Sequence, residues 1–245
     1  MNKTKGIILA GGKGQRLMPL TLTTPKPLVE VNRKPLINYN LGLFWKYGVK
    51  EVKIIIRAED REPYAQWHHG YASQFPGTTI TFVEENEPMG TFGYIAHHLA
   101  VWIGDEKVFV TNGDDIKDID LRLMLDVHTA ANLPASIALM KMEDPSDYGA
   151  VVVESGKVVG FLEKQKNMLP GPVSAGMYLI DKKTISFIKE RVVPLENFLM
   201  FEKDAFPLLV ENNKLHAFVC EGAFLDCGTP ERLASAEQFL KTFKQ

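Results

Sequence analysis

A glycine-rich loop with two cationic side chains follows a short apolar run near the N-terminus. The run 6–10 ends in Leu9 and Ala10, and the loop after it carries Gly11, Gly12, Lys13, Gly14 and Arg16. Glycine lets the backbone come close to a ligand and present N–H groups to phosphate oxygens, and neighbouring cations suit a triphosphate. Taken alone, such a loop fits an ordinary structural turn equally well.

Two common glycine-loop motifs are excluded. The P-loop pattern GxxxxGK[ST] is absent because Gly14 is followed by Gln15, and the dinucleotide pattern GxGxxG breaks at Leu17. Further along, Lys26 stands between Pro25 and Pro27, which stiffen the backbone on both sides of it. This stiffness favours a functional position for Lys26 over that of a solvated loop lysine.

The composition is that of an ordinary globular protein. The 245 residues are 45% hydrophobic and 24% charged, with a formal net charge of -2, so no overall field attracts nucleic acid or an anionic membrane. The two cysteines, Cys220 and Cys227, form no disulfide framework or zinc motif. The run 6–10 is too short for a signal-peptide core, and no run approaches the ~18 apolar residues of a membrane span. We predict a cytoplasmic protein with no membrane contact.

The elements that must position the loop alternate in type over the first 110 residues. Strands are predicted over 6–10, 52–56, 78–83 and 107–111, and helices over 35–47, 62–72 and 91–102. Strand-like runs then dominate at 135–140, 150–154, 158–162 and 174–180, with a hairpin turn at 154–157 and helices over 182–191 and 230–243. The pattern predicts an α/β fold with a mostly parallel, doubly wound mixed sheet, formed by one domain over residues 1–245.

Seven further motifs follow the loop in order. They are PKPLVEV at 25–31 with KPLI at 34–37, EPMGT at 87–91, NGD at 112–114, DYG at 147–149, FLEK at 161–164, SAGMY at 174–178 and FLDCGTPE at 224–231. With GxGxRLxPLT at the loop itself, this series resembles the sugar-phosphate nucleotidyltransferase family, the NDP-sugar pyrophosphorylases. The matches run through the whole chain. The resemblance therefore implies a Rossmann-like nucleotidyltransferase fold and an enzyme of nucleotide-sugar biosynthesis.

The implied reaction is attack by a sugar-1-phosphate oxygen on the α-phosphorus of a nucleoside triphosphate, with release of pyrophosphate. Such chemistry depends on positioning and charge neutralisation. The resemblance assigns catalytic roles to Arg16, Lys26 and Asp114. It assigns nucleotide binding to Leu9, Ala10, Gly11, Gly12, Gly14, Glu85, Gly90, Thr91 and Asn112.

Two carboxylates are implied as ligands of Mg²⁺, the expected cofactor. Asp114 follows a strand and Asp226 follows the apolar run 223–225, and Mg²⁺ prefers hard oxygen ligands together with substrate phosphates. Their proximity rests on the resemblance, because sequence spacing does not bring them together. We expect the neighbouring Asp115 and Asp118 to lie in a solvated loop or to cap a helix from Leu121 onward.

The sugar phosphate has its own implied binding residues. By resemblance, Glu163 binds sugar hydroxyls, Lys164 binds the sugar phosphate, and Tyr148 and Gly149 let the backbone approach the hexose. Ser174, like Gly176, lies where the family contacts the sugar ring. Taken without this context, the pair at 163–164 fits an exposed strand end.

The nucleobase is the most open point. Thymidylyl and uridylyl branches of the family commonly carry a glutamine where this chain has the acidic run 84–87, and guanine presents a pair of donors that match a carboxylate such as Glu85. The EPMGT segment also resembles mannose- and heptose-1-phosphate guanylyltransferases, which favours GTP. Dependence on UTP, dTTP or CTP stays open, and the acids in this run also fit a solvated surface.

Two other classes of function compete with this one. A metal-dependent glycosyltransferase of similar build would use Asp114 and Asp115 as its acidic motif but would not require the loop 16–26. A binding or regulatory relative without catalysis is less consistent with the presence of Arg16, Lys26 and Asp226. Only 19 residues follow Asp226, so we expect the catalytic core alone, and homo-oligomers are common in the family.

Overall fold

A computed structural model describes residues 4–148, 150–162, 166–192 and 197–242. Contacts divide the chain into two compact units. Among described residues, the first unit holds 4–88, 111–118 and 223–242, and the second holds 89–110 and 119–222. Strand β6 (Lys107–Asn112) contributes its first four residues to the second unit and its last two to the first.

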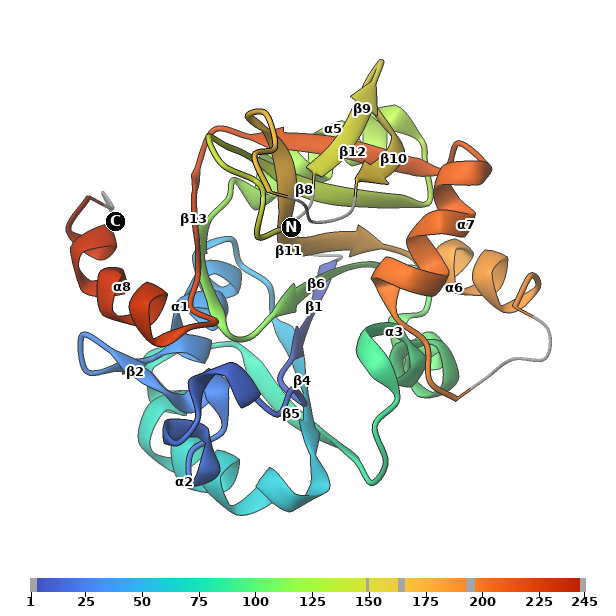
Figure 1. Cartoon of the computed structure of the whole chain (residues 1–245). Coiled ribbons are helices and arrows are strands. Elements are labelled where there is room, and N and C mark those ends of the chain that lie inside the picture. The colour runs from blue at the N-terminus through green and yellow to red at the C-terminus, as the bar shows by residue number, and fades with distance from the viewer. Residues whose placement is uncertain (1–3, 149, 163–165, 193–196, 243–245) are drawn as a thin grey trace. The chain divides into compact units, whose positions relative to one another are not determined.

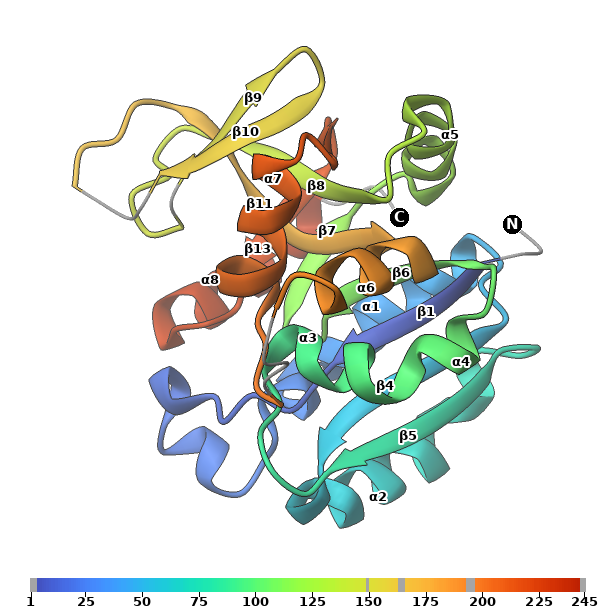
Figure 2. The same cartoon turned by 90° about the vertical axis from the view of Figure 1, so that its right-hand side faces the viewer.

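The first unit is built on three parallel strands. Strand β4 (Glu51–Arg57) lies between β1 (Thr4–Leu9) and β5 (Thr79–Glu85), and both neighbours run parallel to it (Figures 1 and 2). The buried residues of β4 are all isoleucine or valine, and β1 buries Ile7 and Ile8, as expected for strands of a parallel sheet. The predicted strands 6–10, 52–56 and 78–83 are confirmed, and the last extends two residues further than expected.

Two helices cover one face of these strands. Helix α1 (Leu36–Lys46) packs Phe44 so closely on β1 that a Cβ at Gly6 would lie 2.7 Å from the Phe44 ring. Helix α2 (Arg61–Tyr71) places Tyr64 and Trp67 against Phe82 of β5, with ring centroids 5.9 and 6.1 Å apart. Trp67 also donates its indole N–H to Asn38 of α1 at 2.7 Å, which joins the two helices.

Short elements complete the first unit. The pairs β2 (Glu30–Val31) with β3 (Lys34–Pro35) and β7 (Asp115–Asp118) with β13 (Ala223–Asp226) are antiparallel. Helix α8 (Pro230–Thr242) packs Ala236 and Leu233 into a small core with Val31 and Ile116. The remaining short helices are η1 (Gln15–Leu17), η2 (Leu20–Leu22), η3 (Lys26–Leu28), η4 (Ala58–Asp60) and η5 (Ala72–Gln74).

The second unit contains a mixed sheet. Its strands lie in the order β11 (Gly171–Ile180), β8 (Ala135–Met142), β12 (Leu215–Cys220), β10 (Lys157–Leu162) and β9 (Ala150–Glu154). Strand β12 runs parallel to β8, and the other pairs are antiparallel. Ser155 and Gly156 both have positive φ in the β9–β10 hairpin, which confirms the predicted turn at 154–157.

The helices of the second unit form two groups. Segments α3 (Gly90–Tyr94), η6 (Ile95–Leu99) and α4 (Ala100–Ile103) continue one another and lie beside α6 (Lys182–Lys189). Helix α5 (Leu121–Ala131) packs on β8 and β12, while η7 (Phe201–Ala205) leads into α7 (Phe206–Glu211), which packs on β10 and β12. The α/β class with a mixed, mostly parallel core is confirmed; β12 and α7 had no expected counterpart.

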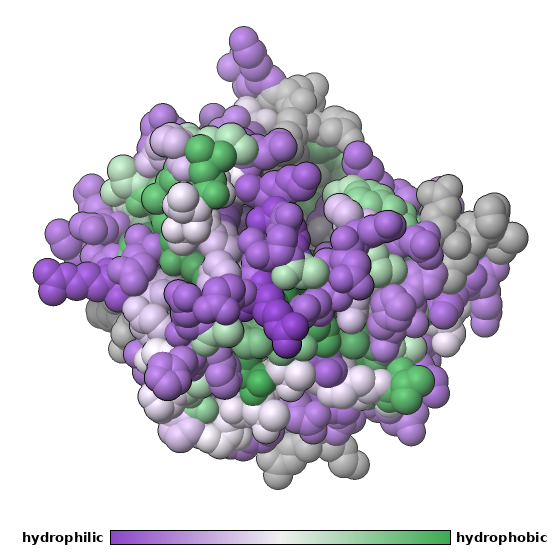
Figure 3. Space-filling view, turned by 90° about the horizontal axis from the view of Figure 1, so that it is seen from below, coloured by the Kyte–Doolittle hydropathy of each residue, from purple (hydrophilic) through white to green (hydrophobic). Residues whose placement is uncertain are grey.

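The described helices include none long and apolar enough to cross a membrane. On the face seen in Figure 3, hydrophobic side chains lie in small groups among hydrophilic ones.

Candidate active site

The glycine loop leaves the end of β1 and is anchored at both ends. The Ala10 N–H donates to the Ile55 carbonyl at 2.8 Å, and the Thr21 hydroxyl donates to the Gly14 carbonyl at 2.8 Å. Gly14 has φ 61°, and a Cβ there would lie 2.9 Å from the Thr21 side chain, so both conformation and space require glycine. A Cβ at Gly12 would meet nothing within 4 Å. Packing therefore explains Gly14, whereas Gly12 lies on an open part of the loop, where a ligand can approach the backbone.

Lys26 lies directly behind this loop and is buried. Lys26 is 6% exposed, and its Nζ donates to Asp114 Oδ2 at 2.6 Å. A Cβ at Gly14 would lie 3.0 Å from the Lys26 Cβ, which shows how closely the two segments pack. The interpretation of Lys26 as a solvated loop lysine is wrong. Lys26 is instead a buried cation whose Nζ is held by Asp114 beside the glycine loop.

Of the two predicted metal ligands, Asp114 lies directly before β7 and Asp226 ends β13. Strands β7 and β13 are antiparallel, and Asp226 lies opposite Asp115, which is the residue after Asp114. The two carboxylates predicted together from the resemblance therefore stand at the same end of this two-stranded sheet. Asp226 Oδ2 also lies 2.5 Å from Nη1 of Arg232, a residue that sequence reasoning missed because nothing in its surroundings marks it.

Arg16 approaches the same end of β13. A Cβ at Gly228 would lie 2.6 Å from Nη2 of Arg16 and 2.7 Å from Oδ1 of Asp226, so both side chains reach this glycine and would have to shift for a larger residue. Gly228 belongs to the FLDCGTPE motif, which was the available signal for this role. The first unit thus brings together Arg16, Lys26, Asp114 and Asp226, four residues from three distant parts of the chain.

The expectation for Asp115 and Asp118 is wrong. Asp115 is buried in strand β7, with a side chain only 5% exposed and its Oδ1 2.6 Å from Nζ of Lys117. Asp118 ends the same strand and pairs with Lys46 at 3.7 Å, while the residue that caps α5 is Asp120. The sequence suggested a loop because four acids in seven residues resemble a solvated run, whereas the first three residues of β7, Asp115 included, are buried.

The electrostatics of this region combine burial with several close charges. Burial raises the pKa of Asp115 to about 7, Lys117 opposes this shift, and the charge of Asp114 adds to it. Burial likewise raises the pKa of the Cys227 thiol to about 12. Cys227 is therefore a neutral, buried side chain, as expected for a structural cysteine.

The remaining nucleotide-binding candidates of the first unit lie at strand ends. Leu9 ends β1, Glu85 ends β5 and Asn112 ends β6. A Cβ at Gly11 would lie 3.0 Å from Oε2 of Glu85, so the carboxylate rests on the glycine loop. Ligands of α/β proteins bind beyond the carboxyl ends of parallel strands, which is where these residues gather.

Gly90 and Thr91 belong to the second unit and have packing partners there. Gly90 has φ 74°, and a Cβ on it would lie 2.3 Å from the Leu199 carbonyl oxygen. The Thr91 hydroxyl donates to Glu202 at 3.0 Å and accepts from the Phe201 N–H at 2.9 Å. Both residues thus hold the start of α3 to the segment before α7. Their binding of nucleotide stays a prediction.

The sugar-phosphate candidates are described only in part. Gly149, Glu163 and Lys164 lie outside the described residues. Tyr148 donates its N–H to the Pro145 carbonyl at 2.9 Å. The Ser174 hydroxyl accepts from the Gly176 N–H at 3.3 Å where the β11–β8 register shifts, and such a bulge redirects side chains. Binding of a sugar by these residues stays a prediction.

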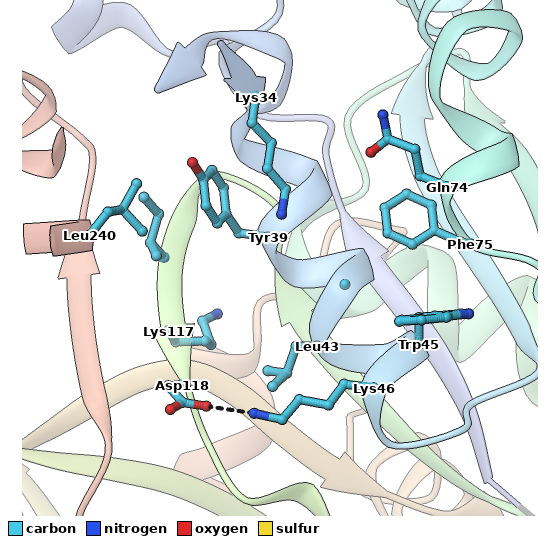
Figure 4. Close-up of a pocket in the computed structure, with 12 residues that line it drawn as sticks. Lys34, Tyr39, Leu43, Trp45, Lys46, Gln74, Phe75, Lys117, Asp118 and Leu240 are labelled. Carbon is cyan, nitrogen blue, oxygen red and sulfur yellow. Dashed lines mark ion pairs between the residues drawn. The ribbon is translucent and has the colours of Figure 1, made fainter. Parts of the chain in front are cut away.

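A separate cavity of about 360 Å³ opens in the first unit between α1, η5 and β7 (Figure 4). Its walls include Tyr39, Trp45, Phe75 and Leu240, and the Lys46–Asp118 ion pair spans one side. None of the predicted catalytic, nucleotide-binding or sugar-binding residues lines it.

The donor set at β7 and β13 fits a magnesium ion shared with substrate. Within the described ranges, no group of three or more His, Cys, Asp and Glu could hold a metal unaided. Two carboxylates at one strand end nevertheless match the usual coordination of Mg²⁺. The ion binds one or two protein carboxylates and completes its coordination shell with phosphate oxygens and water. The side chains of Asp114 and Asp226 are 35% and 17% exposed, so both are partly accessible.

Comparison with known proteins identifies the family. A family model described as nucleotidyl transferase matches residues 5–242. The chain belongs to this family. Over 94% of its length it is 34% identical to a mannose-1-phosphate guanyltransferase of Debaryomyces hansenii, and over 93% it is 35% identical to the catalytic subunit beta of mannose-1-phosphate guanylyltransferase of Danio rerio. The matches cover 63% and 62% of those relatives, so this nucleotidyl transferase spans about three fifths of their length.

Solved structures support the fold. A Bacillus anthracis protein assigned as a glucose-1-phosphate thymidylyltransferase, in complex with sucrose, is 26% identical with a TM-score of 0.84, over 99% of this chain and 97% of that one. HddC from Yersinia pseudotuberculosis, complexed with GMP-PN, is 25% identical with a TM-score of 0.80, over 96% and 99%. The prediction of a Rossmann-like nucleotidyltransferase fold is confirmed.

Proposed function

We propose that this chain transfers a nucleoside monophosphate from a nucleoside triphosphate to a sugar-1-phosphate, giving a nucleotide sugar and pyrophosphate. The observation that carries the proposal is the buried Lys26, held 2.6 Å from Asp114 behind an open glycine loop. This arrangement sets a lysine cation and backbone N–H groups of the loop at one proposed ligand site. Family membership and the guanyltransferase relatives support the same reaction class.

In the proposed reaction, an oxygen of the sugar phosphate forms a bond to the α-phosphorus while the bond from that phosphorus to the pyrophosphate oxygen breaks. The loop backbone at Gly11 and Gly12 binds the triphosphate, and Arg16 neutralises part of its charge. Lys26 stabilises the charge that grows on the departing pyrophosphate, which requires its Nζ to turn from Asp114 toward phosphate. The catalytic contribution is positioning and neutralisation, with no covalent intermediate.

Asp114 and Asp226 are the residues that would hold Mg²⁺. When bound, the ion withdraws charge from the phosphate oxygens and helps fix their geometry. The protein's own part is to hold two carboxylates at the shared end of β7 and β13. A glycosyltransferase that uses Asp114 and Asp115 together is disfavoured, because Asp115 is buried against Lys117.

Guanine is the proposed base, and a mannose- or heptose-type sugar the proposed acceptor. Glu85 can accept hydrogen bonds from guanine N1–H and N2–H₂, and its carboxylate already lies over Gly11. The guanyltransferase relatives and the GMP-PN complex of HddC support this choice. Glu163, Lys164, Tyr148, Gly149 and Ser174 are the proposed sugar-phosphate residues. A single catalytic domain, homo-oligomers and a cytoplasmic location stay predictions.

The test is a matrix of GTP, UTP, dTTP, CTP and ATP against mannose-, glucose-, heptose- and amino-sugar-1-phosphates. Release of pyrophosphate that requires Mg²⁺ is expected for GTP with a mannose- or heptose-type sugar. Success with another triphosphate would overturn the choice of base but support the reaction class. The absence of release from every pair, with nucleotide binding intact by calorimetry, would contradict the proposed function and favour a binding protein.

A further inference from the structure

A network of buried polar groups holds the connection between β6 and β7. Lys117 donates from Nζ to the Thr111 hydroxyl at 2.7 Å and forms the ion pair with Asp115. Asn40 of α1 donates from Nδ2 to the Asp115 carbonyl at 2.8 Å, and its Oδ1 lies 3.4 Å from the Thr111 hydroxyl. The side chains of Asn40, Thr111 and Lys117 thus join both sides of the turn between β6 and β7. None of the three has a role in the proposed chemistry.

Asp114 stands at the tip of that turn. Asp115 is buried at the start of β7, whereas Asp114, directly before the strand, is 35% exposed and pairs with Lys26. The tip is also held against β1, because the Gly113 N–H donates to the Leu9 carbonyl at 2.9 Å and a Cβ at Gly113 would lie 2.9 Å from Ile8. The backbone on both sides of Asp114 is therefore fixed.

Stability alone does not account for this network. The Lys117 side chain is fully buried and that of Asp115 is 5% exposed. Burying such a pair costs desolvation energy, and well-packed apolar residues of similar size often do as well or better. A buried charge pair one residue away from a ligand carboxylate is better explained by the geometry it imposes there.

We propose that Thr111, Lys117 and Asn40 are positioning residues that hold the Asp114 carboxylate in place for the metal–phosphate group. They act through the turn and touch neither substrate nor metal. This inference rests on the proposed function for its chemical consequence, but the restraint on the turn can be measured without it. Outer groups that orient metal ligands typically change metal affinity or activity by about 10–100-fold when they are removed.

The decisive variant is Thr111→Val, which keeps the shape of the buried side chain and removes the hydroxyl that accepts from Lys117. Thr111→Ser keeps the hydroxyl and is the conservative rescue. Thr184→Val is the matched control. Thr184 is also fully buried and donates to a backbone carbonyl, that of Pro134 at 2.6 Å, in the second unit.

Three measurements are made on each variant of the full chain. Hydrogen exchange reads the amides of 113–117, calorimetry reads binding of an equimolar mixture of Mn²⁺ and inorganic pyrophosphate, and pyrophosphate release gives kcat and KM. We expect Thr111→Val to speed exchange at 113–117, to weaken Mn²⁺–pyrophosphate binding about tenfold and to lower kcat more than it changes KM. For Thr111→Ser, we expect the exchange rates, the Mn²⁺–pyrophosphate affinity and the kinetic constants to stay within about threefold of the parent values.

The outcomes separate this inference from the proposed function. Unchanged exchange at 113–117 in Thr111→Val overturns the inference whether or not the parent protein is active. Faster exchange with parental binding and kcat in an active protein also overturns it, because the turn then restrains nothing the reaction needs. Equal losses in Thr184→Val would assign the effect to stability and overturn the inference. A parent that transfers no nucleotide to any sugar phosphate contradicts the proposed function instead.

Discussion

The two units of this protein bury polar side chains in different ways. The first unit buries charge: Lys117 and Asp115 form an ion pair inside it, and Lys26 is 6% exposed beside Asp114. The second unit buries neutral polar groups. His128 on α5 is 2% exposed and its Nδ1 lies 2.8 Å from the Ser136 hydroxyl, which lies 3.4 Å from Nδ1 of His216.

The two arrangements differ in the desolvation free energy that burial requires. Neutral hydrogen-bonded groups are buried with little penalty, whereas buried charges lose much of their hydration energy. In the second unit, burial lowers the pKa of His128 to about 4, so the imidazole stays uncharged at neutral pH. Among the described residues, the buried charged side chains lie in the first unit, which also holds the glycine loop proposed to bind phosphate, so we expect the buried charge to serve that site.

The largest expected effect comes from removing the buried cation. Lys26→Ala should lower kcat by two to three orders of magnitude, about 3 kcal/mol of barrier, because the departing pyrophosphate loses its stabilising charge. Release of pyrophosphate at saturating substrate measures this. Lys50→Ala, an exposed lysine of the same unit, is the control and should keep parental kcat. Near-parental turnover in Lys26→Ala would remove the catalytic reason for burying charge in the first unit.

Alanine substitutions at two glycines, Gly90 in the second unit and Gly12 in the first, should affect stability and ligand binding separately. Gly90→Ala should destabilise the second unit by about 3 kcal/mol, because φ is 74° and the new Cβ meets the Leu199 carbonyl oxygen.

Gly12→Ala should leave the free energy of unfolding unchanged, since its Cβ meets nothing within 4 Å, yet reduce triphosphate binding. Urea unfolding and calorimetry with GTP measure the two effects, and Gly160→Ala, with an equally open Cβ, is the control for the second unit. A stable Gly90→Ala would contradict the packing role.

The neutral buried histidine of the second unit, His128, should make the stability of that unit depend on pH. With a pKa of about 4 in the folded state and 6.5 unfolded, His128 binds more protons in the unfolded chain between these values. Stability from His128 is therefore complete above pH 6.5 and falls by ~3 kcal/mol as pH drops to 4. Lys107 and His216 lower the pKa in the same direction.

Hydrogen exchange at β8 and β12 as a function of pH measures this loss in the second unit. His128→Asn should flatten the pH dependence between 6.5 and 4, because the titrating group is gone. An unchanged slope in that variant would assign the acid sensitivity to other groups.

The smallest effect concerns base choice. Glu85→Gln should shift the ratio of kcat/KM for GTP over UTP by about tenfold toward UTP, since a neutral amide no longer matches the two donors of guanine. Glu84→Gln is the matched control, because Glu84 pairs with Arg61 at 3.4 Å on the exposed side of the same strand. An unchanged ratio in Glu85→Gln would remove Glu85 from base recognition.

Much of the fold followed from sequence patterns. The β-branched runs at 52–56 and 78–83 and the helical stripes at 35–47 and 62–72 predicted elements that the structure contains, because strongly periodic segments carry their own signal. Strand β7 was missed for the opposite reason. Its four residues include three charged ones, and their burial depends on partners more than seventy positions away or across the turn, such as Asn40.

The order and spacing of the glycine loop and the motifs after it were enough to predict the family, and they singled out the charged residues proposed to bind phosphate. Three features come from tertiary structure: Lys26 is buried and paired, Asp226 lies opposite Asp115, and Asp115 is the buried ion-pair partner of Lys117. The reason is that burial and strand register are properties of contacts between distant segments. The spacing of residues along the chain does not contain them.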